Sequence, residues 1–204
     1  MSRTGAFFIA IEGVDAVGKR TQTSLLKAWL EARGLSVRTL SFPAYETAIG
    51  KQIRDFLDGK ISYPPQVRAM LYAANRWEKK AELEATLSKA DVTIVDRYTG
   101  SNLAYGVSSG LALEWLRVLD AGLPEPDVTL VLDAPLAKTM PRRSGMKDSY
   151  EGDTRLQEMA RRAYLELAKE FGWTIVDASM GIEDVRSSIR SAVSKAMEIR
   201  GRTV

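Results

Sequence analysis

The sequence predicts an α/β fold in which helices flank a doubly wound, five-stranded parallel sheet. Three observations predict it. Short apolar runs recur along the 204 residues, longer segments with helical spacing separate these runs, and a glycine-rich loop follows the first of them. We expect one domain over residues 1–204, with a lid at approximately 136–153.

Five apolar runs are the expected strands. Several of them show little alternation of apolar and polar residues, which is typical of strands that are covered on both faces. Their ranges are 6–11, 36–42, 92–95, 128–132 and 173–176.

Segments with helical spacing lie between these strands. The first predicts a helix over 21–33, and Gly34 can cap its C-terminal end. Tyr63-Pro64-Pro65 begins a long helical segment that runs to Ala90. The apolar stripes of the first and the last helix consist of Leu25, Leu26, Trp29 and Leu30, and of Val185, Ile189 and Val193.

The stretch 135–153 differs from the rest of the chain. It carries Arg142, Arg143 and Lys147 together with two glycines and few apolar residues. We expect a mobile, cationic lid over a binding site, and a solvated loop is the alternative interpretation.

The composition excludes several kinds of chemistry. The chain has no Cys and no His, which excludes a disulfide framework, a thiolate or histidine metal site and Ser–His catalysis. The net charge of +3 permits an anionic ligand but does not favour nucleic acid, which requires a dense basic stripe. The first apolar run is far shorter than the ~20 residues of a membrane span, and no signal peptide is recognisable. We therefore expect a cytoplasmic protein whose partners include neither nucleic acid nor a membrane.

A phosphate-binding loop is predicted directly after the first strand. The pattern G-x-x-x-x-G-K is matched by Gly13-Val14-Asp15-Ala16-Val17-Gly18-Lys19, between an expected strand and an expected helix. The glycines let backbone N–H groups turn inward around a polyphosphate, and the helix N-terminus is directed at the same anion. Lys19 adds a positive charge at the β- and γ-phosphates. A glycine turn with a surface lysine is the alternative.

The residue after Lys19 departs from this pattern. Ser or Thr is expected there as a ligand of Mg²⁺, whereas Arg20 stands at this position and Thr21 follows. Either Thr21 or a water supplies the missing ligand, or the metal is held from the acceptor side. Arg20 either adds a second cation near the phosphates or points outward. We expect residues 13–21 to bind ATP.

A charged pair ends the third expected strand. Asp96 and Arg97 lie at the C-terminal edge of the sheet, where ligands of parallel sheets bind. Asp96 can hold Mg²⁺ directly or through water, and Arg97 can bind an anionic acceptor. A structural ion pair at a strand end is the alternative interpretation.

Tyr72 and Arg76 are four residues apart, so they share one face of the long helical segment. An aromatic ring beside a forked donor suits a flat heterocycle, on which the ring stacks while the guanidinium donates to a carbonyl. The spacing alone favours the alternative interpretation, an amphipathic helix with a snorkelling arginine.

Taken together, these motifs resemble those of thymidylate kinases. The resemblance covers nearly the whole chain in order, and the motifs that carry it lie at 12–22, 41–43, 71–78, 96–105 and 177–185. It implies a P-loop nucleoside monophosphate kinase fold, a homodimer, and the reaction of ATP with dTMP to give ADP and dTDP, with Mg²⁺.

The resemblance also implies roles for individual residues. Asp15 would approach the 3′-hydroxyl of the acceptor sugar, Arg76 would hydrogen-bond the base and Arg97 would hold the dTMP phosphate. Asp96 would lie near the metal. The segment 177–182, which includes Ser179, would border the adenine. The complete set of expected dTMP-binding residues is Asp15, Phe42, Tyr72, Arg76, Arg97, Ser101, Tyr105 and Tyr150.

Two departures from the family concern positive charge. Tyr45 stands where the family often has an arginine that binds the acceptor phosphate, and Ala16 and Val17 supply no cation inside the loop. Some family members place the catalytic arginines in the lid instead, and this sequence resembles them. The expected catalytic residues are therefore Lys19, Asp15, Arg97, Arg142 and Arg143.

Other functions remain open at this point. The nearest is a kinase for another nucleoside monophosphate or for a deoxynucleoside. A P-loop ATPase or switch without an acceptor is a second, although it normally needs a residue that positions water. A third is an inactive nucleotide-binding scaffold, which Arg20 and Tyr45 would favour.

Overall fold

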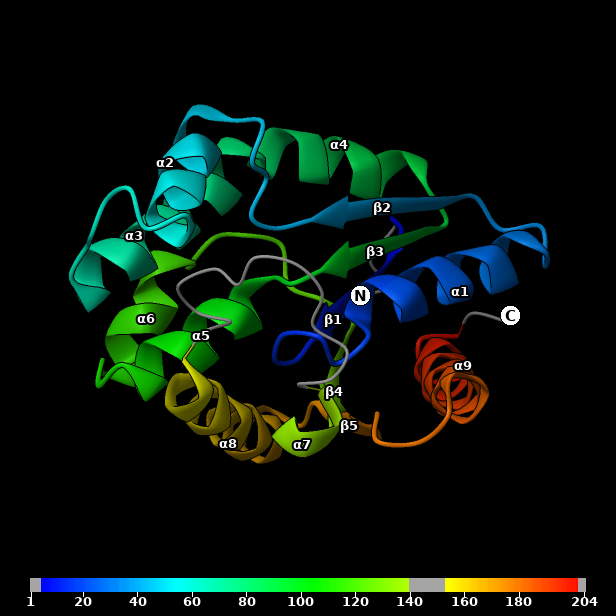
Figure 1. Cartoon of the computed structure of the whole chain (residues 1–204). Helices are drawn as coiled ribbons and strands as arrows, with labels where there is room; N and C mark the ends of the chain where they lie inside the picture. The colour runs from blue at the N-terminus through cyan, green and yellow to red at the C-terminus, as the bar shows by residue number, and fades with distance from the viewer. Residues whose placement is uncertain (1–4, 140–152, 202–204) are drawn as a thin grey trace.

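A parallel sheet forms the centre of the molecule in the computed structural model, which describes residues 5–139 and 153–201 (Figure 1). In these residues the sheet has five strands in the order β2-β3-β1-β4-β5, and all neighbouring pairs are parallel. The predicted α/β class and doubly wound sheet are confirmed. The strands are β1 (Phe7–Glu12), β2 (Val37–Ser41), β3 (Val92–Asp96), β4 (Val128–Asp133) and β5 (Thr174–Asp177).

Helices cover both faces of this sheet (Figure 1). Helices α1 and α9 pack together on one face, while α4 and α8 cover the other and α5 packs on α8. The helices are α1 (Lys19–Glu31), α2 (Ala48–Leu57), α3 (Pro65–Glu78), α4 (Lys80–Lys89), α5 (Thr99–Ser108), α6 (Leu113–Leu119), α7 (Leu136–Thr139), α8 (Thr154–Phe171) and α9 (Ile182–Ile199).

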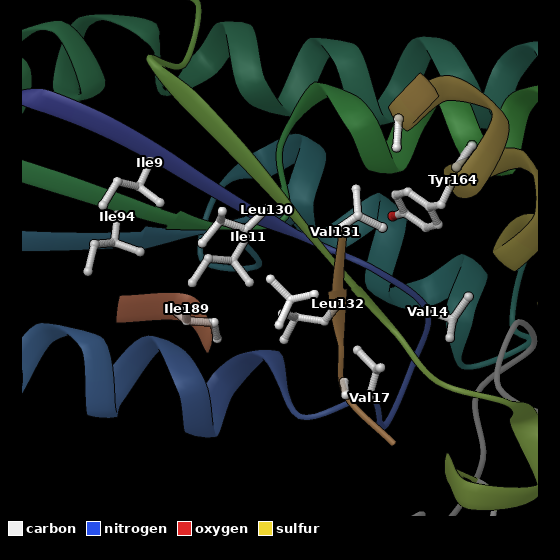
Figure 2. Packing of buried hydrophobic residues seen from close by; sticks show 14 of the residues in the cluster. Ile9, Ile11, Val14, Val17, Ile94, Leu130, Val131, Leu132, Tyr164 and Ile189 are labelled. Carbon is white, nitrogen blue, oxygen red and sulfur yellow. The ribbon is translucent and has the colours of Figure 1, made fainter. Parts of the chain in front are cut away.

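The side chains of β1 alternate between two hydrophobic cores because successive strand residues point to opposite faces. Ile9 and Ile11 belong to the larger core, which α1 and α9 help to enclose, whereas Phe8 packs against Leu83 of α4. Figure 2 shows Ile9 and Ile11 near Ile189 of α9. The central strands are buried on both faces, as the apolar runs predict.

The edge strands do not share this burial. In β5, Ile175 is 44% exposed, and in β2 Arg38 and Thr39 are exposed. An edge strand has a neighbour on one side only, so part of its surface faces solvent. Coverage on both faces therefore applies to the inner strands.

The prediction of one long helical segment from 63 to 90 is wrong in one respect, because this segment consists of two helices. Pro65 begins α3 as expected, but the backbone departs from helical geometry at Lys79 (φ −98°, ψ 3°). The break lets α3 pack against α2 and α5 while α4 lies on β3. Leu83 thereby reaches the core beside Val95.

Of the expected lid, residues 136–139 and Asp153 fall within the described residues. There α7 buries Leu136 and Thr139 against the rest of the fold. The predicted lid residues Arg142, Arg143, Lys147 and Tyr150 lie outside the described ranges. Within those ranges, no helix is both long enough and apolar enough to cross a membrane.

Candidate active site

The sheet topology brings the two charged motifs together. Strand β1 lies between β3 and β4, and Ile11 is in register with Asp96. The loop that follows β1 therefore lies beside the turn that follows β3, at the C-terminal edge of the sheet. This edge is where ligands of open α/β sheets bind.

The loop after β1 has a backbone that requires glycine at two places. Gly13 has φ +134°, and a Cβ there would lie 2.5 Å from the carbonyl oxygen of Leu132. Gly18 has φ +104° and is the N-cap of α1. This end of α1 has no side-chain cap, so its first N–H groups are open to a ligand.

Lys19 lies folded over this loop and is only 8% exposed. Its Nζ donates hydrogen bonds to the carbonyl oxygens of Gly13 (2.9 Å) and Val14 (2.8 Å). Burial, followed by the nearby positive charge of Arg97, lowers the pKa of Lys19 to about 8, although nearby carboxylates oppose the shift. The lysine is thus a poorly solvated cation in a loop shaped for phosphate, and a bound anion would stabilise its charge.

Arg97 projects from the turn after β3 in a left-handed backbone conformation, with φ +63°. Its Nη1 donates to the carbonyl oxygen of Gly13 (3.1 Å) and to Ser101 Oγ (3.1 Å), and its Nη2 donates to Asp15. The guanidinium therefore joins the phosphate loop, the turn and helix α5.

Asp15 accepts hydrogen bonds from three elements. Besides Arg97, the Tyr105 hydroxyl of α5 (3.1 Å) and Gln157 Nε2 of α8 (2.7 Å) donate to its carboxylate. Burial alone would raise the pKa of Asp15, but the charges of Arg97 and Lys19 hold it well below its usual range. Asp15 is therefore ionised at neutral pH.

A buried carboxylate supports this arrangement from behind. Glu12, the last residue of β1, has no exposed surface. It accepts hydrogen bonds from the Tyr98 backbone N–H (2.8 Å), from Ser101 Oγ (2.6 Å) and from the Tyr164 hydroxyl (3.2 Å). It thus holds the strained turn that carries Arg97 as well as the serine that accepts from Arg97.

Asp96 has one carboxylate oxygen that suits a cation. Its Oδ1 is buried and accepts no hydrogen bond within the described residues. Mg²⁺ prefers carboxylate oxygens, and one or two of them suffice when phosphates complete its coordination. No group of three or more acidic residues in the described ranges could hold a metal, so Asp96 fits Mg²⁺ only together with a bound nucleotide. Thr21 and Arg20 are exposed on the first turn of α1.

A pocket opens next to Asp15 and Arg97, between α2, α3 and α5. It brings together all the expected dTMP-binding residues that lie within the described ranges. These are Asp15, Phe42, Tyr72, Arg76, Arg97, Ser101 and Tyr105.

Asn75 fastens the loop after β2 to the wall of this pocket. The backbone N–H of Ala44 donates to Asn75 Oδ1 (2.8 Å), and Asn75 Nδ2 donates to the Ala44 carbonyl oxygen (3.2 Å). These two hydrogen bonds hold the loop in which Phe42 and Tyr45 line the pocket. Tyr45 stands at the position where the sequence analysis expects an arginine in many family members. The Arg54 guanidinium carbon lies 3.8 Å from the centre of the Tyr45 ring.

Arg76 is 3% exposed and is paired with a carboxylate that the sequence analysis did not predict. Its Nε donates to Asp120 Oδ1 (2.9 Å), and its Nη2 donates to Oδ1 and Oδ2 (2.8 Å each). Arg76 lines the pocket, whereas Asp120 does not.

The segment 177–182, which is expected to border the adenine, lies beside α1, which follows the phosphate loop. Ser179 is half-buried, and its N–H donates to Asp177 Oδ1 (2.9 Å). Gln22 of α1 donates from Nε2 to the Ile182 carbonyl oxygen (3.1 Å). The segment 177–182 therefore lies beside the helix that follows the phosphate loop.

Sequence reasoning missed several residues of this site. Glu12 could have been found, because it is a charge at the end of an otherwise apolar strand, beside the glycine loop. Gln157, Tyr164 and Asp120 carry no such local signal.

Known proteins are similar to this chain over most of its length. The family model of thymidylate kinase matches residues 11–189. The chain is 37% identical to thymidylate kinase of Homo sapiens over 192 residues, with 93% of this chain and 90% of that protein covered. It is 35% identical to thymidylate kinase of Schizosaccharomyces pombe, with 91% and 90% covered. The structure resembles thymidylate kinase from Candida albicans with a TM-score of 0.80 at 29% identity, with 94% and 92% of the two chains covered.

Proposed function

The chain belongs to the thymidylate kinase family, and from this premise we propose that it transfers the γ-phosphoryl group of ATP to dTMP, giving ADP and dTDP. One observation carries the proposal to the site. Asp15 belongs to the phosphate loop, and Arg97 donates hydrogen bonds to Gly13 and Asp15 of that loop. Both residues also line the adjoining pocket. A donor on the loop and an acceptor in the pocket would therefore meet at these residues.

Phosphoryl transfer requires little covalent chemistry from the protein, so positioning and positive charge supply most of the catalysis. Lys19 and the loop N–H groups would bind the β- and γ-phosphates of ATP. Arg97 would hold the acceptor phosphate in line with them. The attacking oxygen belongs to a phosphate that is already largely dianionic near pH 7, so no general base is required.

Mg²⁺ fits this mechanism through Asp96. When bound, the metal supplies charge that neutralises the phosphate oxygens during transfer. Asp96 would hold it through the carboxylate oxygen that has no hydrogen-bond donor within the described residues. We also propose that Arg142 or Arg143, from the expected lid, stabilises the charge of the transition state.

A panel of acceptors tests the proposed reaction. ADP formation is measured with dTMP, dUMP, dCMP, dGMP and AMP in turn. We expect dTMP to be the best acceptor. Loss of the thymine methyl costs about 1–3 kcal/mol in any pocket, so dUMP should be a slower substrate. Cytosine carries an amine where Arg76 would donate to a carbonyl, so dCMP should be poor. ADP formation that no monophosphate stimulates would favour a P-loop ATPase or switch instead.

The depressed pKa of Lys19 predicts a pH dependence. The free enzyme loses the lysine charge above a pKa of about 8, so kcat/KM for ATP should fall by about tenfold per pH unit above that value. The Lys19→Arg variant is the control, because its guanidinium stays charged throughout this range. Whatever activity it retains should be nearly flat in pH. The same alkaline decline in both proteins would assign the titration to another group.

We propose a homodimer that pairs through α3 and α6. Met70 and Trp77 of α3 and Val118 of α6 are exposed large apolar side chains on two helices that contact each other. A patch of this kind is typical of an interface.

Introducing a charge into this face should separate the subunits. Val118 is 71% exposed, and we expect Val118→Asp to shift the mass measured by light scattering from dimer towards monomer. Ile199→Asp is the matched control, because Ile199 is 76% exposed at the end of α9, far from this face (Figure 1). A Val118→Asp variant that stays dimeric would place the interface elsewhere.

A further inference from the structure

The ion pair between Arg76 and Asp120 joins two elements that the sequence separates by 44 positions. Arg76 lies in α3, and Asp120 caps the C-terminal end of α6. Both side chains are almost completely buried, at 3% and 6% exposure. The pair has three hydrogen bonds of 2.8–2.9 Å, which fixes the plane of the guanidinium as well as its position.

The contacts divide the guanidinium into two edges. The edge formed by Nε and Nη2 is occupied by Asp120. All hydrogen bonds of the Arg76 side chain to the described residues come from Nε and Nη2, so Nη1 is left for another acceptor, and Arg76 lines the pocket. An N–H group at the wall of a pocket, on a side chain that cannot rotate freely, is a fixed donor for a ligand. Arginine also has no acceptor, so this position can satisfy a carbonyl but not an amine.

We propose that Asp120 is a positioning residue for base selection, which holds Arg76 so that its Nη1 meets a base carbonyl and excludes an exocyclic amine. This inference rests on the proposed function, because it assumes that the base of a pyrimidine monophosphate enters the pocket. Asp120 itself does not line the pocket, so it acts only through Arg76. Without the carboxylate, the guanidinium gains freedom to turn aside, and a base that carries an amine is then tolerated.

A second contact joins the same two elements. It provides a control that distinguishes a role of Asp120 in base selection from simple support of the fold. Trp77 Nε1 donates to the Leu119 carbonyl oxygen (2.9 Å), and the Trp77 ring lies against Gly122. Trp77 therefore ties α3 to the segment after α6, as Asp120 does, but it belongs to the exposed side of α3 and not to the pocket. Loss of this contact should weaken the packing and leave base selection unchanged.

The experiment compares Asp120→Asn with Trp77→Phe. Asparagine keeps the size of the side chain but removes its charge and one acceptor. We measure kcat and KM for dTMP and dCMP with ATP, together with the melting temperature. For Asp120→Asn we expect KM for dTMP to rise about tenfold, KM for ATP to stay unchanged, and the preference for dTMP over dCMP to fall at least tenfold. Trp77→Phe should keep the wild-type preference.

The outcomes separate the inference from the function on which it rests. Wild-type enzyme that does not phosphorylate dTMP would overturn both. Wild-type enzyme that prefers dTMP, with an Asp120→Asn variant that melts earlier but keeps this preference, would overturn the inference alone. If Asp120→Asn does not fold, Asp120→Glu keeps the charge but displaces the carboxylate, and it must show a reduced preference for dTMP over dCMP.

Discussion

Replacing Lys19 with alanine should reduce turnover by at least about a thousandfold, because it removes the cation that we propose contacts the donor phosphates, and charge stabilisation supplies most of the rate of phosphoryl transfer. Steady-state ADP formation with dTMP measures the effect. Lys27→Ala is the matched control, since Lys27 is a more exposed lysine of the same helix, paired with Glu31. A near-normal rate for Lys19→Ala would refute the role of the lysine.

The same substitution should leave the chain folded. Lys19 has a folded-state pKa of about 8, below the 10.5 of an ordinary lysine, so the folded protein bears a cost for keeping it charged at neutral pH. By linkage this cost is about 3 kcal/mol below pH 8 and disappears as the pH rises through the ordinary lysine pKa. Removal of the lysine relieves this cost, and the free energy regained offsets the loss of its two hydrogen bonds. We therefore expect the melting temperature of Lys19→Ala at pH 7 to be no lower than that of the wild type.

Arg97→Ala should have the second largest effect, on activity and on stability together. Loss of the guanidinium that would hold the acceptor phosphate should lower kcat/KM for dTMP by about a thousandfold. It also leaves the largely buried Asp15 carboxylate without its ion-pair partner, which should cost about 3 kcal/mol of unfolding free energy. Denaturant unfolding and initial rates measure the two effects separately.

Two further variants check this interpretation. Asp15→Asn in the Arg97→Ala background removes the unpaired charge, so it should recover part of the stability but none of the activity. Arg161→Ala breaks an ion pair with Asp133 of similar exposure, away from the pocket. It should lose stability and keep the wild-type KM for dTMP. An Arg97→Ala variant with a wild-type KM for dTMP would exclude contact with the acceptor.

The fold could be predicted because its signals are local. Apolar runs mark the strands, and the glycine loop fixes where α1 begins. The break at Lys79 was missed because the sequence around it continues to favour helix. What separates α3 from α4 there is packing, on α2 and α5 in one case and on β3 in the other.

The candidate site could be predicted only in part, for the same reason. Lys19 and Arg97 stand in short motifs, whereas the residues that hold Asp15 and Glu12 beside them come from far along the chain. Gln157 donates to Asp15 across 142 positions, and Tyr164 donates to Glu12 across 152. Such pairs depend on how α8 packs against the sheet, and no spacing rule in one sequence reveals them.

The fate of the γ-phosphate tests the central claim most directly. The enzyme is incubated with dTMP and with ATP that carries radioactive phosphorus at the γ-position, and the products are separated. Transfer between two adjoining nucleotide sites predicts that the label appears in dTDP in equal amount to the ADP formed. Label found only as inorganic phosphate, at a rate that dTMP does not change, would contradict it.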